Sequence, residues 1–130
     1  MSNIGHIIVC DEVFNSPNGE VIIKQPLNMI FTPILPTHYS FVIAIGLINL
    51  KPTVRYIAVV KVTSPSGKLL LKNDIEFDIG NEDTAEFTAA GGYNINCRNV
   101  LLDEFGDYII SVEIDKERNQ LILPVVKKED

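Results

Sequence analysis

The chain has 130 residues, of which 46% are hydrophobic and 22% charged, and its formal net charge is −6. This length predicts one domain, residues 1–130, with a core large enough to fold without disulfide bonds. The acidic balance argues against wrapping a nucleic-acid backbone, which needs clustered Lys and Arg, and against docking on anionic lipid.

Charge is spread unevenly along the chain. Residues 1–73 hold three acidic and six basic residues, whereas residues 74–130 hold fourteen acidic and five basic residues. The two cysteines, Cys10 and Cys97, are too few for a disulfide framework. No basic region precedes the first apolar run, and no apolar run reaches the length of a membrane-spanning helix. We therefore expect a cytoplasmic protein with both thiols free and with no nucleic-acid or membrane partner.

The first third of the chain predicts a hairpin and a proline-marked connection. Residues 4–14 and 20–24 are apolar and β-rich, and the turn sequence Asn-Ser-Pro-Asn-Gly lies between them. Three prolines between residues 26 and 36 then exclude a helix interior. Residues 27–31 are predicted to form a short strand or an apolar loop over the core.

Residues 39–48 alternate large apolar side chains with a second set that is small and hardly polar. This pattern predicts a central strand that is covered on both faces, or one whose outer face meets a partner. Gly46 is expected to mark a bulge or a close backbone contact.

Residues 54–63 and 68–79 predict a second hairpin around the turn Ser-Pro-Ser-Gly. Pairing the two residues that flank this turn places apolar side chains on one face of the hairpin. On the other face, Arg55 would lie opposite Glu76 as a cross-strand charge pair. Asn73 would point inward, where it needs a hydrogen-bond partner or a bulge.

Residues 80–102 give a mixed signal. A turn is expected at 80–83, a short half-buried strand at 84–90 and an irregular polar loop at 91–99. Residues 100–102 could be a strand or a helical turn.

The strongest hairpin signal lies near the C-terminus, where residues 105–115 and 120–126 flank a polar stretch. A four-residue loop at 116–119 would place Ile114 opposite Leu121 and put both apolar faces on one side.

Pro124 cannot donate a hydrogen bond to a neighbouring strand, so strand 120–126 is predicted to be an edge strand. Residues 127–130 are expected to be a frayed tail.

Together these segments predict an all-β fold, an antiparallel β-sandwich of seven or eight strands with immunoglobulin-like or related topology. The chain has no Trp and no cysteine pair that could bridge two sheets, so it is not an antibody-type domain. A closed barrel is the alternative, and the proline-marked edge argues against it.

The loop expected at 91–99 is the first candidate binding surface. It carries Tyr93, Asn94 and Arg98, and Tyr and Arg are enriched at the energetic centres of protein interfaces. The alternative is a loop that merely crosses one end of the sandwich.

The carboxylates Asp103, Glu104 and Asp107 form the second candidate. Closely spaced acids can coordinate Ca²⁺, but this segment lacks the Asp-x-Asp-x-Asp-Gly spacing of a calcium loop. The alternative is a solvated turn that leads into a strand.

Catalytic motifs are missing from the sequence. It contains no Gly-x-Ser-x-Gly elbow, no phosphate-binding loop and no dinucleotide-binding glycine motif. His6, Cys10, His38 and Cys97 have the stoichiometry of a zinc site, but nothing in their spacing brings them together. We predict no catalytic residues, no metal and no cofactor, and hence a protein that is not an enzyme.

Several short pieces along the chain carry a family resemblance. They are Cys10–Val13, Asn18–Val21, Ile30–Phe31, Ser64–Gly67 and Phe105–Tyr108. In these pieces the chain resembles an uncharacterised bacterial family of small β-sandwich proteins of unknown function, also met in phages and mobile elements. The resemblance implies the fold and brings no activity and no site residues.

The sequence thus predicts a non-enzymatic cytoplasmic β-sandwich that acts by binding a protein partner or by self-association, with a phage or mobile-element accessory role as one setting. The alternative is a module that binds a small ligand or a metal through residues 91–99 or 103–107. An enzyme on a sandwich scaffold is the third reading, and fold alone does not choose among them.

Overall fold

The computed structural model describes residues 3–51, 54–77 and 89–129, and every regular element in these ranges is a β-strand. The strands are β1 (Ile4–Asn15), β2 (Val21–Pro26), β3 (Ile30–Thr32), β4 (Thr37–Leu50), β5 (Tyr56–Thr63), β6 (Leu69–Phe77), β7 (Ala89–Leu102), β8 (Gly106–Ile114) and β9 (Glu117–Lys127). The all-β prediction is confirmed. The described strands number nine rather than seven or eight, partly because the proline-marked connection contributes β3.

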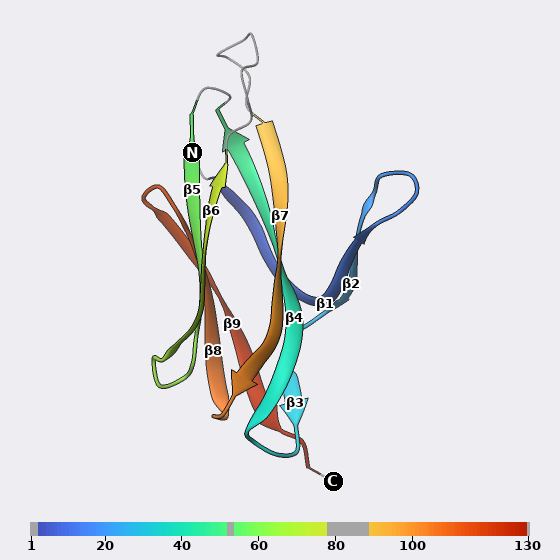
Figure 1. Ribbon diagram of the computed structural model, residues 1–130, viewed down its shortest axis with the longest axis vertical. Coiled ribbons are helices and arrows are strands. Elements are labelled where there is room, and N and C mark those ends of the chain that lie inside the picture. Colours follow the sequence, from blue (N-terminus) through green and yellow to red (C-terminus); the bar gives the residue numbers. More distant parts are fainter. Residues whose placement is uncertain (1–2, 52–53, 78–88, 130) are drawn as a thin grey trace.

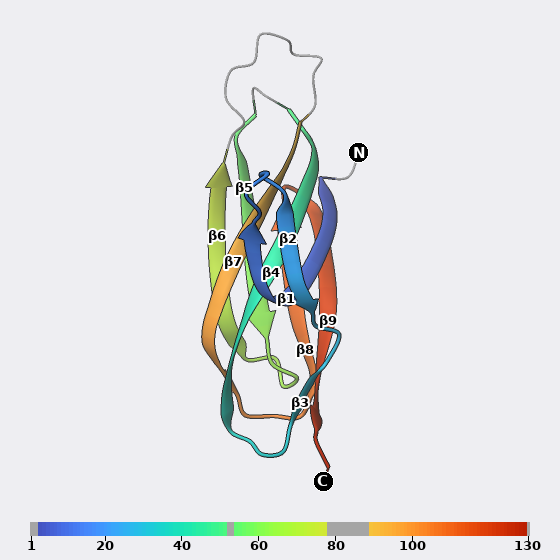
Figure 2. The same ribbon diagram turned by 90° about the vertical axis from the view of Figure 1, so that its right-hand side faces the viewer.

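Two sheets pack face to face as the layers of a sandwich (Figure 1, Figure 2). One has four strands in the order β2-β1-β4-β7, and the other has five in the order β3-β9-β8-β5-β6. Neighbouring strands are antiparallel except β3 and β9, which are parallel. The turn expected at 80–83 and most of the strand expected at 84–90 lie outside the described residues.

Strand β4 is central and covered on both faces, as its sequence predicts. It pairs with β1 on one side and β7 on the other, and all seven residues from Phe41 to Leu47 are buried. Alternate residues from Phe41 to Leu47 join the core between the sheets. Val42 and Ala44 are buried too, but they do not belong to that core cluster. Side chains of the neighbouring strands therefore cover the outer face of β4.

Gly46 is the close contact that its sequence position suggests. It pairs across the sheet with His6, and a Cβ atom built on Gly46 would lie 2.1 Å from the His6 ring. The ring occupies the space above the glycine, so only a residue without a side chain fits under it.

The β5–β6 hairpin forms around the expected turn, where Ser64 N–H donates to the Lys68 carbonyl at 2.8 Å. Its register differs from the expected one because the pairing shifts next to the turn, and Val62 lies opposite Leu71 rather than Leu69. The shift is two residues, so each side chain keeps its face.

Two side chains of this hairpin were singled out by the sequence. Arg55 and Glu76 do form an ion pair, with 2.5 Å between Nε and Oε1, although Glu76 lies opposite Ile57. Asn73 does lie on the inward face, opposite Val60 rather than Ala58, but it is not buried there. Asn73 is exposed, because β6 is the edge strand of its sheet, and water can satisfy its amide.

The β8–β9 hairpin is tighter than expected. Ile114 lies opposite Glu117 rather than Leu121, so Asp115 and Lys116 alone make the turn. Asp115 has a positive φ of 53°, the conformation that a two-residue hairpin loop requires at its first position. The expected four-residue loop is therefore wrong, and the pairing of β8 with β9 is displaced by four residues from the expected register. The even shift still leaves Leu123 on the core face, where it is buried.

No described strand pairs with the outer side of residues 120–124, as Pro124 predicts, but the end of β9 is covered. Strand β3 pairs with residues 125–127, and Lys128 N–H donates to the Thr32 carbonyl at 2.9 Å. The tail expected at 127–130 is thus ordered at least through Lys128. The start of β9 is tied to the other sheet, because Asn3 N–H and Ile4 N–H donate hydrogen bonds to the Glu117 carboxylate at 2.6 and 3.3 Å.

Candidate functional site

The loop expected at 91–99 is in fact part of strand β7, which pairs with β4 along most of its length. Tyr93 is half-buried and packs against the core, whereas Asn94 and Arg98 are exposed on the other face. The glycines and asparagines of this stretch are poor strand formers, and for that reason the sequence predicted a loop here. The period-two alternation of Tyr93, Ile95 and Cys97 was the signal that could have found it.

The carboxylates of the β7–β8 connection do not converge. The Asp103 carboxylate pairs with the Lys68 ammonium at 2.8 Å, and Glu104 accepts a hydrogen bond from the Ser66 hydroxyl at 2.7 Å. The Asp103 contact raises the pKa of Lys68. Asp107 lies on β8 opposite Pro124. Over the described ranges, no three His, Cys, Asp or Glu side chains come together in a way that could hold a metal ion.

Tyr108 holds this connection against the sandwich. Its hydroxyl donates to the Glu104 carbonyl at 2.9 Å and accepts from the Glu104 N–H at 3.3 Å, while its ring is 1% exposed. Burial raises the pKa of the Tyr108 hydroxyl. A tyrosine near the start of a strand that bonds backbone a few residues upstream is a tyrosine corner. The acidic residues therefore belong to a braced corner between the sheets.

A bulge in β7 turns Arg98 away from the regular ladder. Phe41 lies opposite Cys97 and Tyr39 opposite Val100, so two residues of β7 face the single Ser40 of β4. Asn99, the second residue of the bulge, has a positive φ of 53°, and its N–H donates to Ser40 Oγ at 2.9 Å. Bulges re-aim side chains and occur often beside functional sites.

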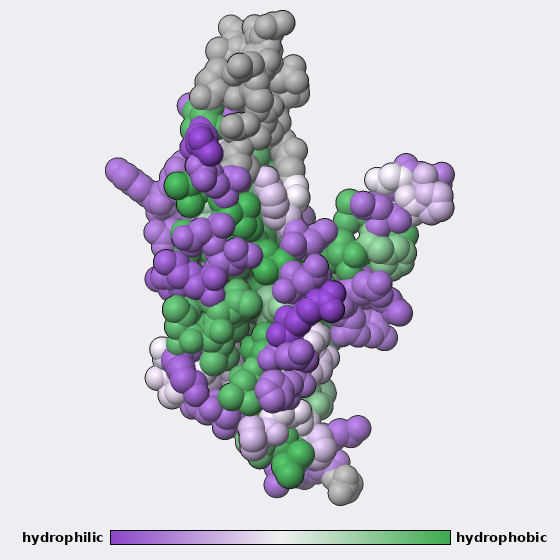
Figure 3. All heavy atoms as spheres, in the orientation of Figure 1, coloured by the Kyte–Doolittle hydropathy of each residue, from purple (hydrophilic) through white to green (hydrophobic). Residues whose placement is uncertain are grey.

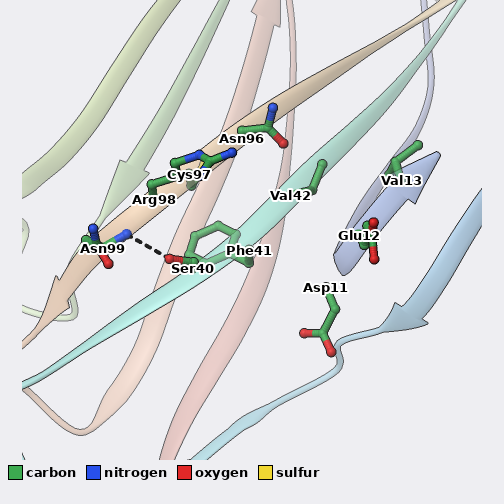
Figure 4. Close-up of a pocket in the computed structure, with 10 residues that line it drawn as sticks. All are labelled: Asp11, Glu12, Val13, Ser40, Phe41, Val42, Asn96, Cys97, Arg98 and Asn99. Atoms are coloured by element: carbon green, nitrogen blue, oxygen red, sulfur yellow. Dashed lines mark hydrogen bonds between the residues drawn. The ribbon is translucent and has the colours of Figure 1, made fainter.

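A cleft of about 370 Å³ opens beside this bulge. It lies where β1 separates from β4, and its lining comes from β1, β4 and β7: Asp11, Glu12, Val13, Ser40, Phe41, Val42, Asn96, Cys97, Arg98 and Asn99. Figure 4 shows Asp11 and Glu12 on one side of β4 and Arg98 and Asn96 on the other. Of the candidate binding residues named from sequence, only Arg98 lines this cleft, together with Asn96, Cys97 and Asn99 of the loop expected at 91–99. No sequence signal marks Asp11 and Glu12, because the cleft depends on where β1 leaves the sheet.

Both cysteines are buried and free. Cys97 belongs to the core between the sheets, whereas Cys10 lies opposite Val42 and outside the core cluster. In the described residues, the hypothetical zinc ligands His6, Cys10, His38 and Cys97 therefore do not come together. Burial raises the pKa of the Cys97 thiol to about 11 and also raises that of Cys10.

An apolar patch covers one end of the outer face of the five-stranded sheet. Ile122, Ile109, Thr63 and Leu69 follow one another across β9, β8, β5 and β6. Phe31 and Val126 pair beside the end of β9 and extend the patch. We call Phe31, Leu69, Ile109, Ile122 and Val126 the apolar patch.

A polar row borders the apolar patch and consists of Gln120, Ser111, Lys61 and Lys72. In Figure 3, hydrophobic surface gathers low on the side of the molecule that carries β5 and β6, below a band of hydrophilic side chains. Phe31 is 60% exposed, Leu69 53% and Ile122 52%. The patch is therefore open to a partner.

One family model matches residues 6–126, which run from β1 to the next-to-last residue of β9. The chain belongs to DUF6941, a family of unknown function. The match spans the cleft and the apolar patch, so both lie within the DUF6941 domain. No curated protein matches the chain. The expected membership of a family of unknown function is confirmed, and the bacterial or phage origin stays a prediction.

The described part of this DUF6941 chain contains no helix that is long and apolar enough to cross a membrane.

Proposed function

We propose that this DUF6941 chain is a non-enzymatic protein-binding β-sandwich that docks a protein partner, or a second copy of itself, on the apolar patch. The observation that carries the proposal is the exposure of Phe31, Leu69 and Ile122 on one sheet face, where Ile109 and Val126 lie between them. A contiguous apolar patch rimmed by polar residues marks an interaction surface more often than scattered apolar residues do.

The size of the expected effect follows from burial. Removing apolar surface from water contributes about 25 cal/mol per Å², so covering a patch of roughly 300 Å² contributes several kcal/mol before the entropic cost of association. Such a surface suits docking on another protein. The cytoplasmic location inferred from the two cysteines is part of the same proposal.

We also propose an immunoglobulin-like topology for the sandwich. The neighbours β1-β4-β7 would correspond to strands A, B and E of that fold, and β9-β8-β5 to strands G, F and C. The position of Tyr108 near the start of β8, with its hydroxyl on the Glu104 backbone, supports this because the tyrosine corner of that fold lies on strand F.

Light scattering on the purified chain and on two variants tests the docking proposal. Ile122→Asp places a charge inside the apolar patch. Ile57→Asp makes the same change at an equally exposed isoleucine of the same sheet, 53% against 52% exposed. We expect the native chain and Ile57→Asp to associate with rising concentration, or to capture the same host protein when used as bait, and Ile122→Asp to lose that association at least tenfold.

A chain that stays monomeric and captures no protein whose recovery depends on Ile122 would overturn the proposal. Equal loss in both variants would also count against it, because the effect would then follow from added charge and not from the apolar patch.

A further inference from the structure

The cleft beside the β7 bulge is built by strand geometry. The pairing of β1 with β4 ends at Cys10 and Val42, and from there β1 pairs with β2 alone. No described strand takes the place of β1 beside residues 37–41 of β4. Backbone hydrogen-bonding groups on that side of β4 are left for another partner, as on any open strand edge.

One wall of the cleft presents hydrogen-bond donors. Arg98 is exposed and forms no ion pair with any described residue. The Ser40 hydroxyl accepts from the Asn99 N–H, which leaves its own hydrogen to donate. A planar guanidinium suits a carboxylate, which accepts two parallel hydrogen bonds from arginine, and the Ser40 hydroxyl lines the same cleft.

The opposite wall presents negative charge. Asp11 and Glu12 are exposed, and neither forms an ion pair in the described ranges, although Lys24 lies opposite Glu12 in the β1–β2 pairing. Burial, and then the charge of Asp11, raise the pKa of the nearby Tyr39 hydroxyl.

The two walls stand apart across β4, with Val42 between them (Figure 4). Their opposite charges do not neutralise each other directly, because Arg98 forms no ion pair with Asp11 or Glu12. We propose that the cleft binds a zwitterionic ligand of dipeptide size, with its carboxylate on Arg98 and Ser40 and its ammonium group on Asp11 and Glu12. A cleft of about 370 Å³ falls at the small end of ligand pockets.

A peptide fits this cleft better than another zwitterion of the same size. Its amide group can pair with the open side of β4, in the manner of a short added strand. The site is distinct from the apolar patch, which lies on the other sheet.

Titration calorimetry with alanyl-alanine, and with two blocked forms of it, tests the proposal. We expect the free dipeptide to bind with a dissociation constant of about 1 mM or tighter. The N-acetylated form lacks the ammonium group and the C-amidated form lacks the carboxylate, and each should bind at least tenfold more weakly. In parallel, the NMR signals of the Val42 methyl groups should shift with the free dipeptide, and with the blocked forms only at about tenfold higher concentrations.

Variants then assign the two walls. Arg98→Gln should raise the dissociation constant of the free dipeptide at least tenfold, and the Asp11→Asn, Glu12→Gln double variant should do the same. Arg118→Gln, which removes an exposed arginine from β9, is the matched control and should bind as the native chain does. Ile122→Asp should also bind normally, so failure of the docking proposal would leave this one standing.

Absence of heat and of Val42 shifts with the free dipeptide would overturn the proposal. Equal binding of the free and blocked forms, or unchanged binding in Arg98→Gln, would overturn it as well.

Discussion

Tyr108 concentrates two roles in one side chain. Its ring is buried in the core, and its hydroxyl makes both hydrogen bonds to the Glu104 backbone. The sequence marked the neighbouring Asp103 and Glu104 as ligand candidates, but these residues serve the corner that Tyr108 holds. The sequence placed Tyr108 only within the predicted strand 105–115 and in one of the pieces that carry the family resemblance.

Tyr108→Phe keeps the ring and removes the hydroxyl. We expect a loss of about 1–2 kcal/mol in the free energy of unfolding, because the backbone groups of Glu104 lose their partner. Urea denaturation followed by circular dichroism measures it. Tyr39→Phe, which removes a hydroxyl with no recorded hydrogen bond in the described structure, should cost less. Equal losses in the two variants would contradict the corner's role.

Cys97 predicts an alkaline weakening of the fold. Cys97 is 1% exposed, and burial raises the pKa of its thiol from 9.0 to about 11. The folded state therefore holds this proton more tightly than the unfolded chain. The corresponding stability is fully present below pH 9 and is lost as the pH rises from 9 towards 11, by about 2–3 kcal/mol in all.

Urea denaturation at the two ends of that pH range measures the effect. Cys97→Ala should show a smaller loss between them than the native chain. Val100→Ala, a truncation at another buried position of β7, should keep the native pH dependence. If Cys97→Ala loses as much stability as the native chain over this range, burial of the thiol is not the cause.

At the level of the strands, the alternation of apolar and polar residues predicted correctly which side chains face the core, but it did not predict which residues pair across neighbouring strands. In β8 and β9 the apolar residues lie on the core face as expected, yet the pairing is displaced by four residues. Glu117, Arg118 and Asn119 are polar, so composition reads them as loop, although they continue β9. Polar residues of a solvated strand and of a turn cannot be told apart locally, and the backbone of Asp115 decides where the turn lies.

The same limit applies to the candidate site. Strand β7 was missed because Gly91, Gly92 and the asparagines read as a loop. The bulge at Arg98 and the divergence of β1 from β4 arise from how three strands meet, which no local pattern encodes. Arg98 was found for its side-chain chemistry, whereas the acids facing it were found only from the fold.

The β8–β9 turn gives a prediction at this scale. Asp115 has a positive φ, so Asp115→Gly should leave stability unchanged or raise it by up to about 1 kcal/mol. Asp115→Val should lower it by about 1–2 kcal/mol, because a β-branched residue disfavours this conformation. Lys116→Val is the control at the other turn position. Thermal unfolding measures all three, and similar losses in Asp115→Val and Lys116→Val would show that the conformation of Asp115 is not the limiting feature.

At the level of the whole molecule, the two proposed surfaces lie on different sheets and answer to different forces. The apolar patch is on the outer face of the five-stranded sheet, and the cleft is on the four-stranded sheet. Docking on the patch should be insensitive to salt, because it depends on apolar burial. Binding in the cleft should weaken as salt screens exposed charges. We therefore expect occupation of one proposed surface to leave binding at the other unchanged.

Two contacts that β9 makes with the first third of the chain also affect how the protein folds during its synthesis. Glu117 holds Asn3 and Ile4 across 114 and 113 residues of sequence, and β3 completes its pairing only with the end of β9. On a ribosome, neither contact can close until the final strand has left the exit tunnel. Until then Ile4 and Val9 of β1, which are buried in the complete fold, stay uncovered, and such long-range closure makes folding slow. A chaperone that shields early apolar hairpins would find its client in this waiting chain.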